Sequence, residues 1–221
     1  MNDIAIFDLD GTLIDLKIDR NDFERCRSYW ASYLTSRGIS TTLEPLLPEL
    51  KRISQTSLGS GLKANIIRTF DDIELACTYR LLGRIDALLS TVKLKFRKLV
   101  LVTHNSSALW ARLTRENVWT RLMDTVITRD DTNFFKPDPR VCEAVFRDLT
   151  PNFGCGEFWV VGNSEADRGL GLNLRRNYSD RVVRTFMINP TCSGETRLTD
   201  QLDVDVASVD SLLNLMHDVP A

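Results

Sequence analysis

The chain has 221 residues, enough to bury a core as one large domain or as a domain with a smaller one inserted. A formal net charge of −2 and a pI of about 5.8 give no basic footprint for nucleic acid. No apolar run reaches the roughly 18 residues of a membrane span, and the first residues lead into a strand rather than a secretion signal. The five cysteines are scattered without CxxC spacing, which disfavours a disulfide framework or a structural zinc site. We therefore expect a soluble, cytoplasmic protein that binds neither nucleic acid nor membranes.

Short apolar runs predict buried strands, and helical spacing separates them in the second half of the chain. This alternation predicts an α/β fold, a doubly wound parallel sheet of Rossmann-like type. Ser106 or Ser107 can cap the helix after the second strand, and Pro139 suits a first helical position after Asp138. The strands are expected at residues 4–8, 99–103, 125–128, 158–162, 182–188 and 204–206, and the helices at 108–118, 140–149, 166–174 and 211–217.

The region between the first two strands has a different character. Apolar residues recur at helical intervals over residues 22–37, 43–56 and 62–82, and no strand is evident there. The simplest interpretation is a helical insertion. We expect a core domain formed by residues 1–15 and 90–221, and an inserted helical domain at 16–89.

The stretch "IAIFDLDGTLID" places two acids at the end of the first predicted strand. Asp8 and Asp10 point the same way, at the edge of a parallel sheet where ligands bind. A carboxylate there can attack phosphorus, while a second one can protonate the leaving oxygen and then activate water. Two adjacent carboxylates favour a divalent cation with oxygen ligands, for which Mg²⁺ is best suited. Gly11 allows the backbone a sharp turn near a phosphate.

"FDLDGTLID" resembles the first motif of the haloacid dehalogenase-like superfamily of phosphohydrolases, a hydrophobic strand followed by DxDGT. The resemblance implies a doubly wound core, a helical cap inserted after the first strand, and Mg²⁺ as cofactor. It also implies a Thr or Ser ending the second strand, a Lys before the next helix, and acids after the fourth strand.

Later segments match this pattern in order. In "LVLVTHNS", Thr103 stands where the resemblance implies a hydroxyl that binds the phosphoryl group, and His104 or Asn105 can add donors. In "FFKPDP", Lys136 resembles the lysine that offsets the charge of the nucleophile and phosphate.

The fourth strand ends "WVVGNSEADRGLG", where the chain departs from the family pattern GDxxxD. The same spacing gives Asn163 and Asp167, so the implied metal ligands are Asp8, Asp10, Asn163 and Asp167. An amide oxygen can bind Mg²⁺, but the site loses one negative charge, and Glu165 is a candidate to compensate. The "GLGLN" that follows indicates close packing of a helix on a strand rather than a dinucleotide site.

The implied function is magnesium-dependent hydrolysis of a small-molecule phosphate monoester. Asp8 acts as nucleophile and Asp10 as acid and base, while Thr103 and Lys136 hold the phosphoryl oxygens. Asp10 disfavours dehalogenation, because dehalogenating members lack this second aspartate. Two alternatives stay open: a phosphomutase of the same fold, and, because of Asn163, a module that binds a phosphorylated ligand or partner without hydrolysing it.

Overall fold

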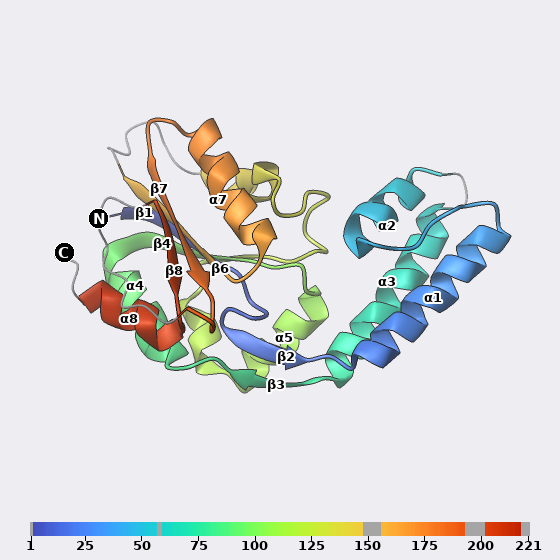
Figure 1. Ribbon diagram of the computed structural model, residues 1–221, viewed down its shortest axis with the longest axis horizontal. Helices are drawn as coiled ribbons and strands as arrows, with labels where there is room; N and C mark the ends of the chain where they lie inside the picture. The colour runs from blue at the N-terminus through green and yellow to red at the C-terminus, as the bar shows by residue number, and fades with distance from the viewer. Residues whose placement is uncertain (1, 57–58, 148–155, 193–201, 218–221) are drawn as a thin grey trace. The chain divides into compact units, whose positions relative to one another are not determined.

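The structure is a computed structural model that describes residues 2–56, 59–147, 156–192 and 202–217 (Figure 1). The chain forms two compact units: Met1–Asp15 with Tyr79–Ala221, and the inserted Leu16–Thr78. The sequence analysis extends the insertion to residue 89. Residues 79–89 instead belong to the first unit, where they form a short strand and the start of a helix that packs on the sheet.

The first unit is built on a six-stranded sheet in the order β5-β4-β1-β6-β7-β8, in which every neighbouring pair is parallel. Successive strands along the chain are added on one side of β1 and then on the other. The carboxyl end of β1 therefore lies at the point where the strand order reverses, the usual ligand position in such sheets. The strands are β1 (Asn2–Phe7), β4 (Phe96–Val102), β5 (Thr125–Ile127), β6 (Glu157–Gly162), β7 (Val182–Ile188) and β8 (Asp203–Val206).

Helices cover both faces of this sheet (Figure 1). On one face, Ile4 and Ile6 pack in the same buried cluster as Leu170 and Leu174 of α7. α4 packs against β4 and α8. The fold is thus the doubly wound α/β fold that the sequence predicts. The helical elements are α4 (Ile85–Lys95), α5 (Ser107–Glu116), η1 (Val118–Leu122), η2 (Pro139–Cys142), α6 (Glu143–Arg147), α7 (Glu165–Asn177) and α8 (Val209–His217).

The inserted unit contains α1 (Arg20–Ser36), α2 (Leu46–Ser54) and α3 (Gly59–Ala76), with α3 contacting both of the others. Their apolar faces meet in a core of their own. The carboxylate of Asp19 caps α1 by accepting from two backbone N–H groups of the first turn. Within the described ranges, no helix combines the length and the hydrophobicity needed to cross a bilayer.

Two short strands were not predicted. β2 (Ile14–Lys17) and β3 (Thr78–Leu81) pair as a two-stranded sheet, and Arg80 Nε lies 2.7 Å from Asp15 Oδ2. The expected helix at 62–82 therefore ends at Ala76, because the β-branched and aromatic residues of "TYRL" favour extended backbone. The helix expected at 140–149 begins as the 3₁₀ turn η2, and residues 148 and 149 lie outside the described residues.

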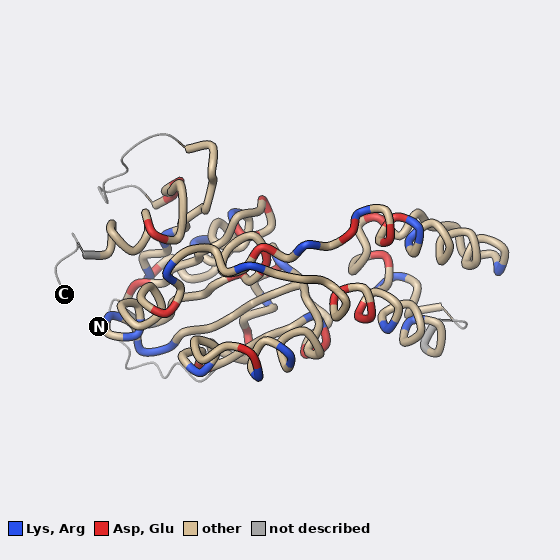
Figure 2. The backbone as a smooth tube through the Cα atoms, turned by 90° about the horizontal axis from the view of Figure 1, so that it is seen from below, with Lys and Arg blue, Asp and Glu red and all other residues tan. Residues whose placement is uncertain are grey.

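Charged residues of both signs are interspersed along the described backbone of each unit (Figure 2). This distribution agrees with the small net charge of the chain.

Candidate active site

The candidate site lies at the carboxyl ends of three neighbouring strands. Phe7, the last residue of β1, pairs with Leu101 of β4 and with Val161 of β6. This register brings Asp8, Thr103 and Asn163, which follow the three strands, to one edge of the sheet. The backbone N–H of Asp8 donates to Val161 O at 2.9 Å, which fixes the nucleophile candidate at that edge.

Lys136 joins two carboxylates in the interior of this edge. Its Nζ lies 2.5 Å from Asp8 Oδ1 and 2.6 Å from Asp167 Oδ1. The side chains of Lys136, Asp8 and Asp167 are 4%, 11% and 1% exposed. Charges this deeply buried are tolerated only when they are paired and hydrogen-bonded. The fold thus brings Asp8, Lys136 and Asp167 into one buried cluster, although they are far apart along the chain.

The pKa values in this cluster are set by burial and by the shared lysine. Burial raises the pKa of Asp8 to about 6. The positive charge of Lys136 lowers this pKa, and repulsion from Asp167 raises it. Burial also opposes ionisation of Asp167, but Lys136 and the hydrogen bonds from Ser164 lower its pKa. Burial disfavours the charge on Lys136, yet the two carboxylates outweigh it and raise the pKa. At neutral pH both aspartates are ionised, with Asp8 the nearer to protonation.

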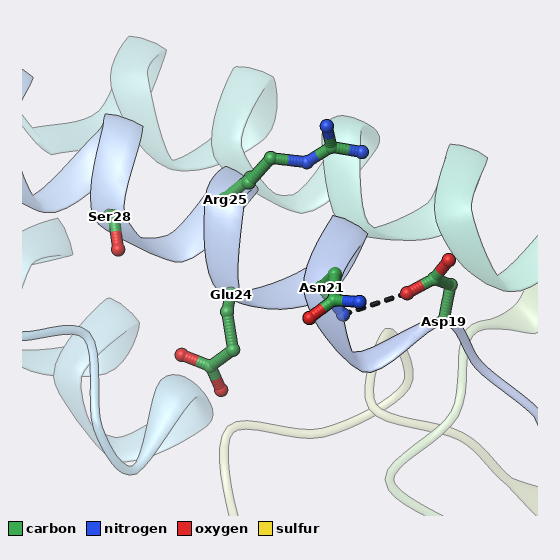
Figure 3. Close-up of a pocket in the computed structure, with 5 residues that line it drawn as sticks. All are labelled: Asp19, Asn21, Glu24, Arg25 and Ser28. Carbon is green, nitrogen blue, oxygen red and sulfur yellow. Dashed lines mark hydrogen bonds between the residues drawn. The ribbon is translucent and has the colours of Figure 1, made fainter.

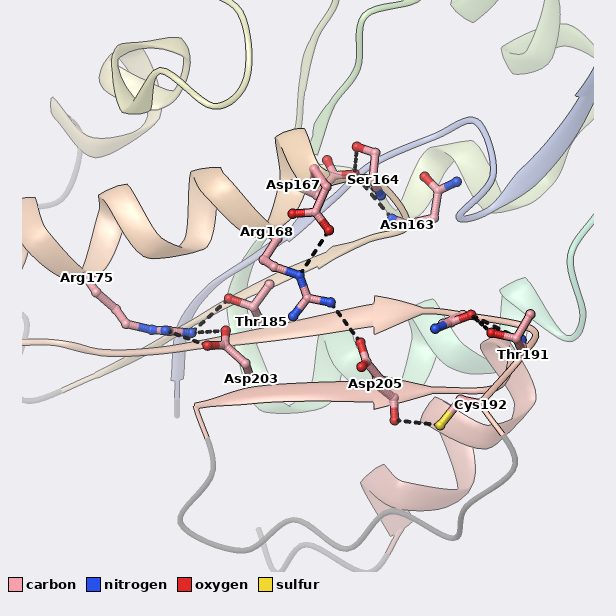
Figure 4. A network of polar contacts seen from close by, with 12 residues as sticks. Asn163, Ser164, Asp167, Arg168, Arg175, Thr185, Thr191, Cys192, Asp203 and Asp205 are labelled. Carbon is pink, nitrogen blue, oxygen red and sulfur yellow. Dashed lines mark hydrogen bonds and ion pairs between the residues drawn. The ribbon is translucent and has the colours of Figure 1, made fainter.

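Asp167 uses both carboxylate oxygens to hold this arrangement. While Oδ1 binds Lys136, Oδ2 accepts from Ser164 Oγ at 2.5 Å, from Ser164 N at 3.0 Å and from Asn163 N at 3.2 Å (Figure 4). This is a capping box at the start of α7. Gly162 makes room for it, because a Cβ there would stand 2.3 Å from the Cβ of Asp167. Asp167, one of the four expected metal ligands, therefore holds Lys136 with one carboxylate oxygen and the start of α7 with the other.

The position of Asp167 depends on how α7 sits on the sheet. Gly171 packs against β7, where an added Cβ would stand 2.1 Å from Thr185 Oγ1, and Gly169 faces Pro137. This confirms the interpretation of "GLGLN" as close packing. Arg168 and Arg175 also tie α7 to Asp205 and Asp203 of β8 (Figure 4).

The DGT turn packs against the loop that begins α7. Gly11 has φ +78°, and a Cβ there would stand 2.0 Å from Asn163 Nδ2, so no side chain larger than hydrogen fits. Thr12 Oγ1 lies 3.4 Å from both Asp8 Oδ2 and Asn163 Oδ1. Asp10 is half-buried in the same turn and bridges to Ile14 through its backbone. Asp8 and Asn163 thus flank one hydroxyl.

This donor set suits a hard divalent cation. Lys136 binds Asp8 Oδ1, whereas Asp8 Oδ2 and Asn163 Oδ1 both lie beside the Thr12 hydroxyl. Carboxylate and amide oxygens are ligands that Mg²⁺ accepts. Across the described ranges, no group of three or more His, Cys, Asp or Glu residues is placed to hold a metal. A site here therefore depends on the Asn163 amide. Glu165 does not compensate, since its side chain is 89% exposed beside Arg168.

The loop after β4 is ordered by its own hydrogen bonds. Thr103 Oγ1 donates to Asn105 Oδ1 at 2.7 Å and accepts from Asn105 N at 3.1 Å, and both residues are buried. Ser106 then caps α5 by accepting from Leu109 N. His104 lies between the two buried residues, and its carbonyl accepts from Arg129 Nη1 at 3.2 Å.

Two residues of this site were not singled out from the sequence. Thr12 was part of the DxDGT pattern, but its place between Asp8 and Asn163 could not be read from spacing. Ser164 could have been found, because serine followed three residues later by an acid is the signature of a capping box.

A separate hollow lies on the inserted unit, on one face of α1 (Figure 3). Every residue that lines it is polar, and Arg25 there pairs with Asp22. The lining residues are Asp19, Asn21, Glu24, Arg25 and Ser28.

Comparison with known proteins shows which family the chain belongs to. The family model described as haloacid dehalogenase-like hydrolase matches residues 5–174. No curated protein matches the chain in sequence.

Several solved structures share the fold at low identity. YfnB from Bacillus subtilis, solved bound to magnesium, is 16% identical with a TM-score of 0.54, over 97% of this chain and 98% of that one. CbbY from Rhodobacter sphaeroides, in complex with phosphate, is 18% identical with a TM-score of 0.54 over 96% of each chain. A 2-haloacid dehalogenase from Pseudomonas syringae is 15% identical with a TM-score of 0.53, over 98% and 99%. With the family model spanning most of its length, the chain belongs to the haloacid dehalogenase-like hydrolases.

Proposed function

We propose that the protein hydrolyses a small-molecule phosphate monoester through an aspartyl-phosphate formed on Asp8, with Mg²⁺ as cofactor. The observation that carries this proposal is the buried Lys136, which bridges Asp8 and Asp167 at the switch point of the sheet. A lysine there keeps the nucleophile ionised at neutral pH and supplies positive charge for a phosphoryl group.

The chemistry uses two displacements at phosphorus. The Asp8 carboxylate attacks, an Asp8–phosphorus bond forms, and the bond to the leaving oxygen breaks as Asp10 gives that oxygen a proton. Asp10, now ionised, takes a proton from water, which attacks phosphorus and releases inorganic phosphate and the free Asp8 carboxylate. Thr103 and Lys136 hold the phosphoryl oxygens, with further donors from the His104–Asn105 backbone.

The metal would be held by Asp8, Asp10 and Asn163, whose oxygens are of the required type. When bound, Mg²⁺ would supply charge neutralisation between the nucleophile and the phosphoryl oxygens. Asp167 supports this site by fixing Lys136, since both of its oxygens are engaged. The inserted helical unit is proposed to act as a cap that excludes water and selects the substrate.

Some proteins of this fold are dehalogenases. One observation favours phosphoryl transfer over dehalogenation for this chain. Asp10 supplies the acid that an alkoxide leaving group needs, whereas a halide leaves without a proton. Asn163 favours a second candidate, a module that binds a phosphorylated ligand without turnover, because the neutral amide weakens the attraction for the cation.

The test is phosphate release from an aryl phosphate with and without Mg²⁺, beside Asp8→Asn. Magnesium-dependent release that vanishes in the variant supports the proposal. A panel of metabolite phosphates extends the assay to substrates that a selective cap would admit. If no member of the panel releases phosphate but the protein still binds inorganic phosphate, the binding module is favoured. Chloride release from a 2-haloacid would favour a dehalogenase.

A further inference from the structure

We propose that Arg129 is a positioning residue of the site. Its guanidinium polarises one peptide group of the loop after β4, and that peptide group makes the Thr103 hydroxyl a stronger hydrogen-bond donor to a bound phosphoryl oxygen. The inference rests on the proposed function, because it takes Thr103 as a donor to phosphate. Arg129 acts through Thr103 rather than on the ligand itself.

The turn after β5 lies against the loop after β4, because the two strands are neighbours in the sheet. Val102 pairs with Ile127, and Thr103 N donates to Ile127 O at 2.9 Å. Arg129 follows two residues later, and its backbone N–H donates to Asn105 O at 3.1 Å. This contact does not depend on the side chain at position 129, so substitutions there should leave the turn attached to the loop.

Hydrogen bonds fix the turn from which the Arg129 side chain extends. Asp131 Oδ2 closes the turn by accepting from Thr128 Oγ1 at 2.6 Å and from Thr128 N at 2.8 Å. Asp130 Oδ2 accepts from Ser107 N at 2.7 Å and from Ser107 Oγ at 2.8 Å, at the start of α5. The turn is therefore fastened to the loop and to the helix that follows it.

A chain of hydrogen bonds runs from the guanidinium to the Thr103 hydroxyl. Arg129 Nη1 donates to His104 O at 3.2 Å. The same peptide group contains the N–H of Asn105, which donates to Thr103 Oγ1 at 3.1 Å. Because a trans peptide group is planar, its C=O and N–H point in opposite directions, so this one group joins the guanidinium to the hydroxyl. Thr103 Oγ1 in turn donates to Asn105 Oδ1 at 2.7 Å.

Such a chain strengthens the donor at its end. The guanidinium is permanently charged, and a charged donor on the carbonyl makes the N–H of the same peptide group a stronger donor. A hydroxyl that accepts this bond becomes a better donor itself. Thr103 and Asn105 are both buried, where the low dielectric preserves the effect. When phosphate binds, the hydroxyl can rotate from Asn105 Oδ1 to a phosphoryl oxygen.

The charge of Arg129 also acts on the side chain of this loop. Burial is the main cause that lowers the pKa of His104 to about 4, and the charges of Lys136 and Arg129 lower it further. Arg129 could therefore favour an anion by its charge alone, without the peptide group. A test of the proposal has to separate these two effects.

Combined variants of Arg129 and Thr103 make that separation. Arg129→Met removes the guanidinium and keeps a long side chain, whereas Arg129→Lys keeps the charge and a donor. Thr103→Val removes the hydroxyl with little change in shape, and Thr103→Ser keeps it. Arg121→Met controls for the loss of a positive charge, since Arg121 is exposed in η1.

The measurement is the affinity for inorganic phosphate, by calorimetry with Mg²⁺ present, beside the Tm of each variant. We expect Arg129→Met to weaken binding about fivefold, alone or together with Thr103→Ser, but less than about twofold together with Thr103→Val. Arg129→Lys should stay within about twofold of wild type, and Arg121→Met should bind as wild type does.

The opposite result is an equal loss with and without the Thr103 hydroxyl, which would show that Arg129 acts by its charge or its packing and would overturn the proposal. Wild-type affinity in Arg129→Met would overturn it as well. A second measurement needs no Thr103 variant: the amide proton resonance of Asn105 should move upfield in Arg129→Met, and an unchanged resonance would refute the polarised peptide group.

The failure of this inference can be told apart from the failure of the proposed function. If Arg129 and Thr103 are coupled in phosphate affinity but no ester is hydrolysed, the role of Arg129 is supported and only the phosphatase proposal is overturned. Absence of phosphate binding by the wild-type protein would overturn both.

Discussion

Replacing the nucleophile candidate should make the metal-free protein more stable. Asp8 is buried, and its folded-state pKa of about 6 exceeds the ordinary 3.8. The difference between these two pKa values corresponds to roughly 3 kcal/mol between the protonated and ionised forms. Asparagine resembles the protonated carboxyl group, so Asp8→Asn should stabilise the protein by up to about 3 kcal/mol at neutral pH. Lys136 keeps Asp167 as its partner at 2.6 Å.

The stability gained by Asp8→Asn should depend on pH. Because the pKa of Asp8 is raised on folding, its contribution to stability is fully present below about pH 4 and is lost as the pH rises through about 6. The advantage of Asp8→Asn should therefore be absent near pH 4 and complete above about pH 7.

Urea denaturation in EDTA at these two pH values measures the effect. Asp180→Asn controls for the loss of one negative charge, since the side chain of Asp180 is 75% exposed. A destabilised Asp8→Asn protein at neutral pH, or a gain that does not change with pH, would refute the reasoning that burial dominates at this site.

Three further substitutions test neighbouring contacts. Gly11→Ala should cost roughly 2–4 kcal/mol and weaken Mg²⁺ binding, because its Cβ would overlap Asn163; Gly38→Ala, at φ +83° with open space around it, should cost only about 1 kcal/mol. Similar losses in the two urea titrations would contradict the Asn163 contact. Lys136→Met leaves two buried carboxylates unpaired and should lower the free energy of unfolding by about 3–5 kcal/mol near neutral pH, with recovery on acidification; a pH-independent loss would argue against it. Asn163→Asp restores a charge and should tighten Mg²⁺ binding by calorimetry at least several-fold, and unchanged affinity would remove Asn163 from the ligand set.

The sheet and the site edge could be predicted because strand-terminal motifs are local. Asp8, Thr103 and Asn163 each follow a buried apolar run, and a parallel sheet necessarily brings such ends to one edge. Lys136 was found through its motif rather than through any pattern of burial.

Other features depend on contacts that spacing does not reveal. β2 and β3 are four residues each, too short to show an alternating pattern. The sequence analysis therefore extended the insertion to residue 89, whereas the inserted unit ends at Thr78. The hydrogen bonds that engage both carboxylate oxygens of Asp167 depend on packing between the Lys136 loop and the start of α7. Sequence patterns identify such residues as candidates, but only the fold shows what they contact.

The most direct test of the central claim is to trap the covalent intermediate on Asp8. In the Asp10→Asn variant, Asp8 should still attack an aryl phosphate, because that leaving group needs little protonation. The variant should fail to activate water, so the acyl phosphate on Asp8 should accumulate. Acid quench, borohydride reduction and peptide mass spectrometry should then convert residue 8 to homoserine, in amounts that depend on Mg²⁺. Reduction at another carboxylate, or phosphate release with residue 8 always unmodified, would contradict the account.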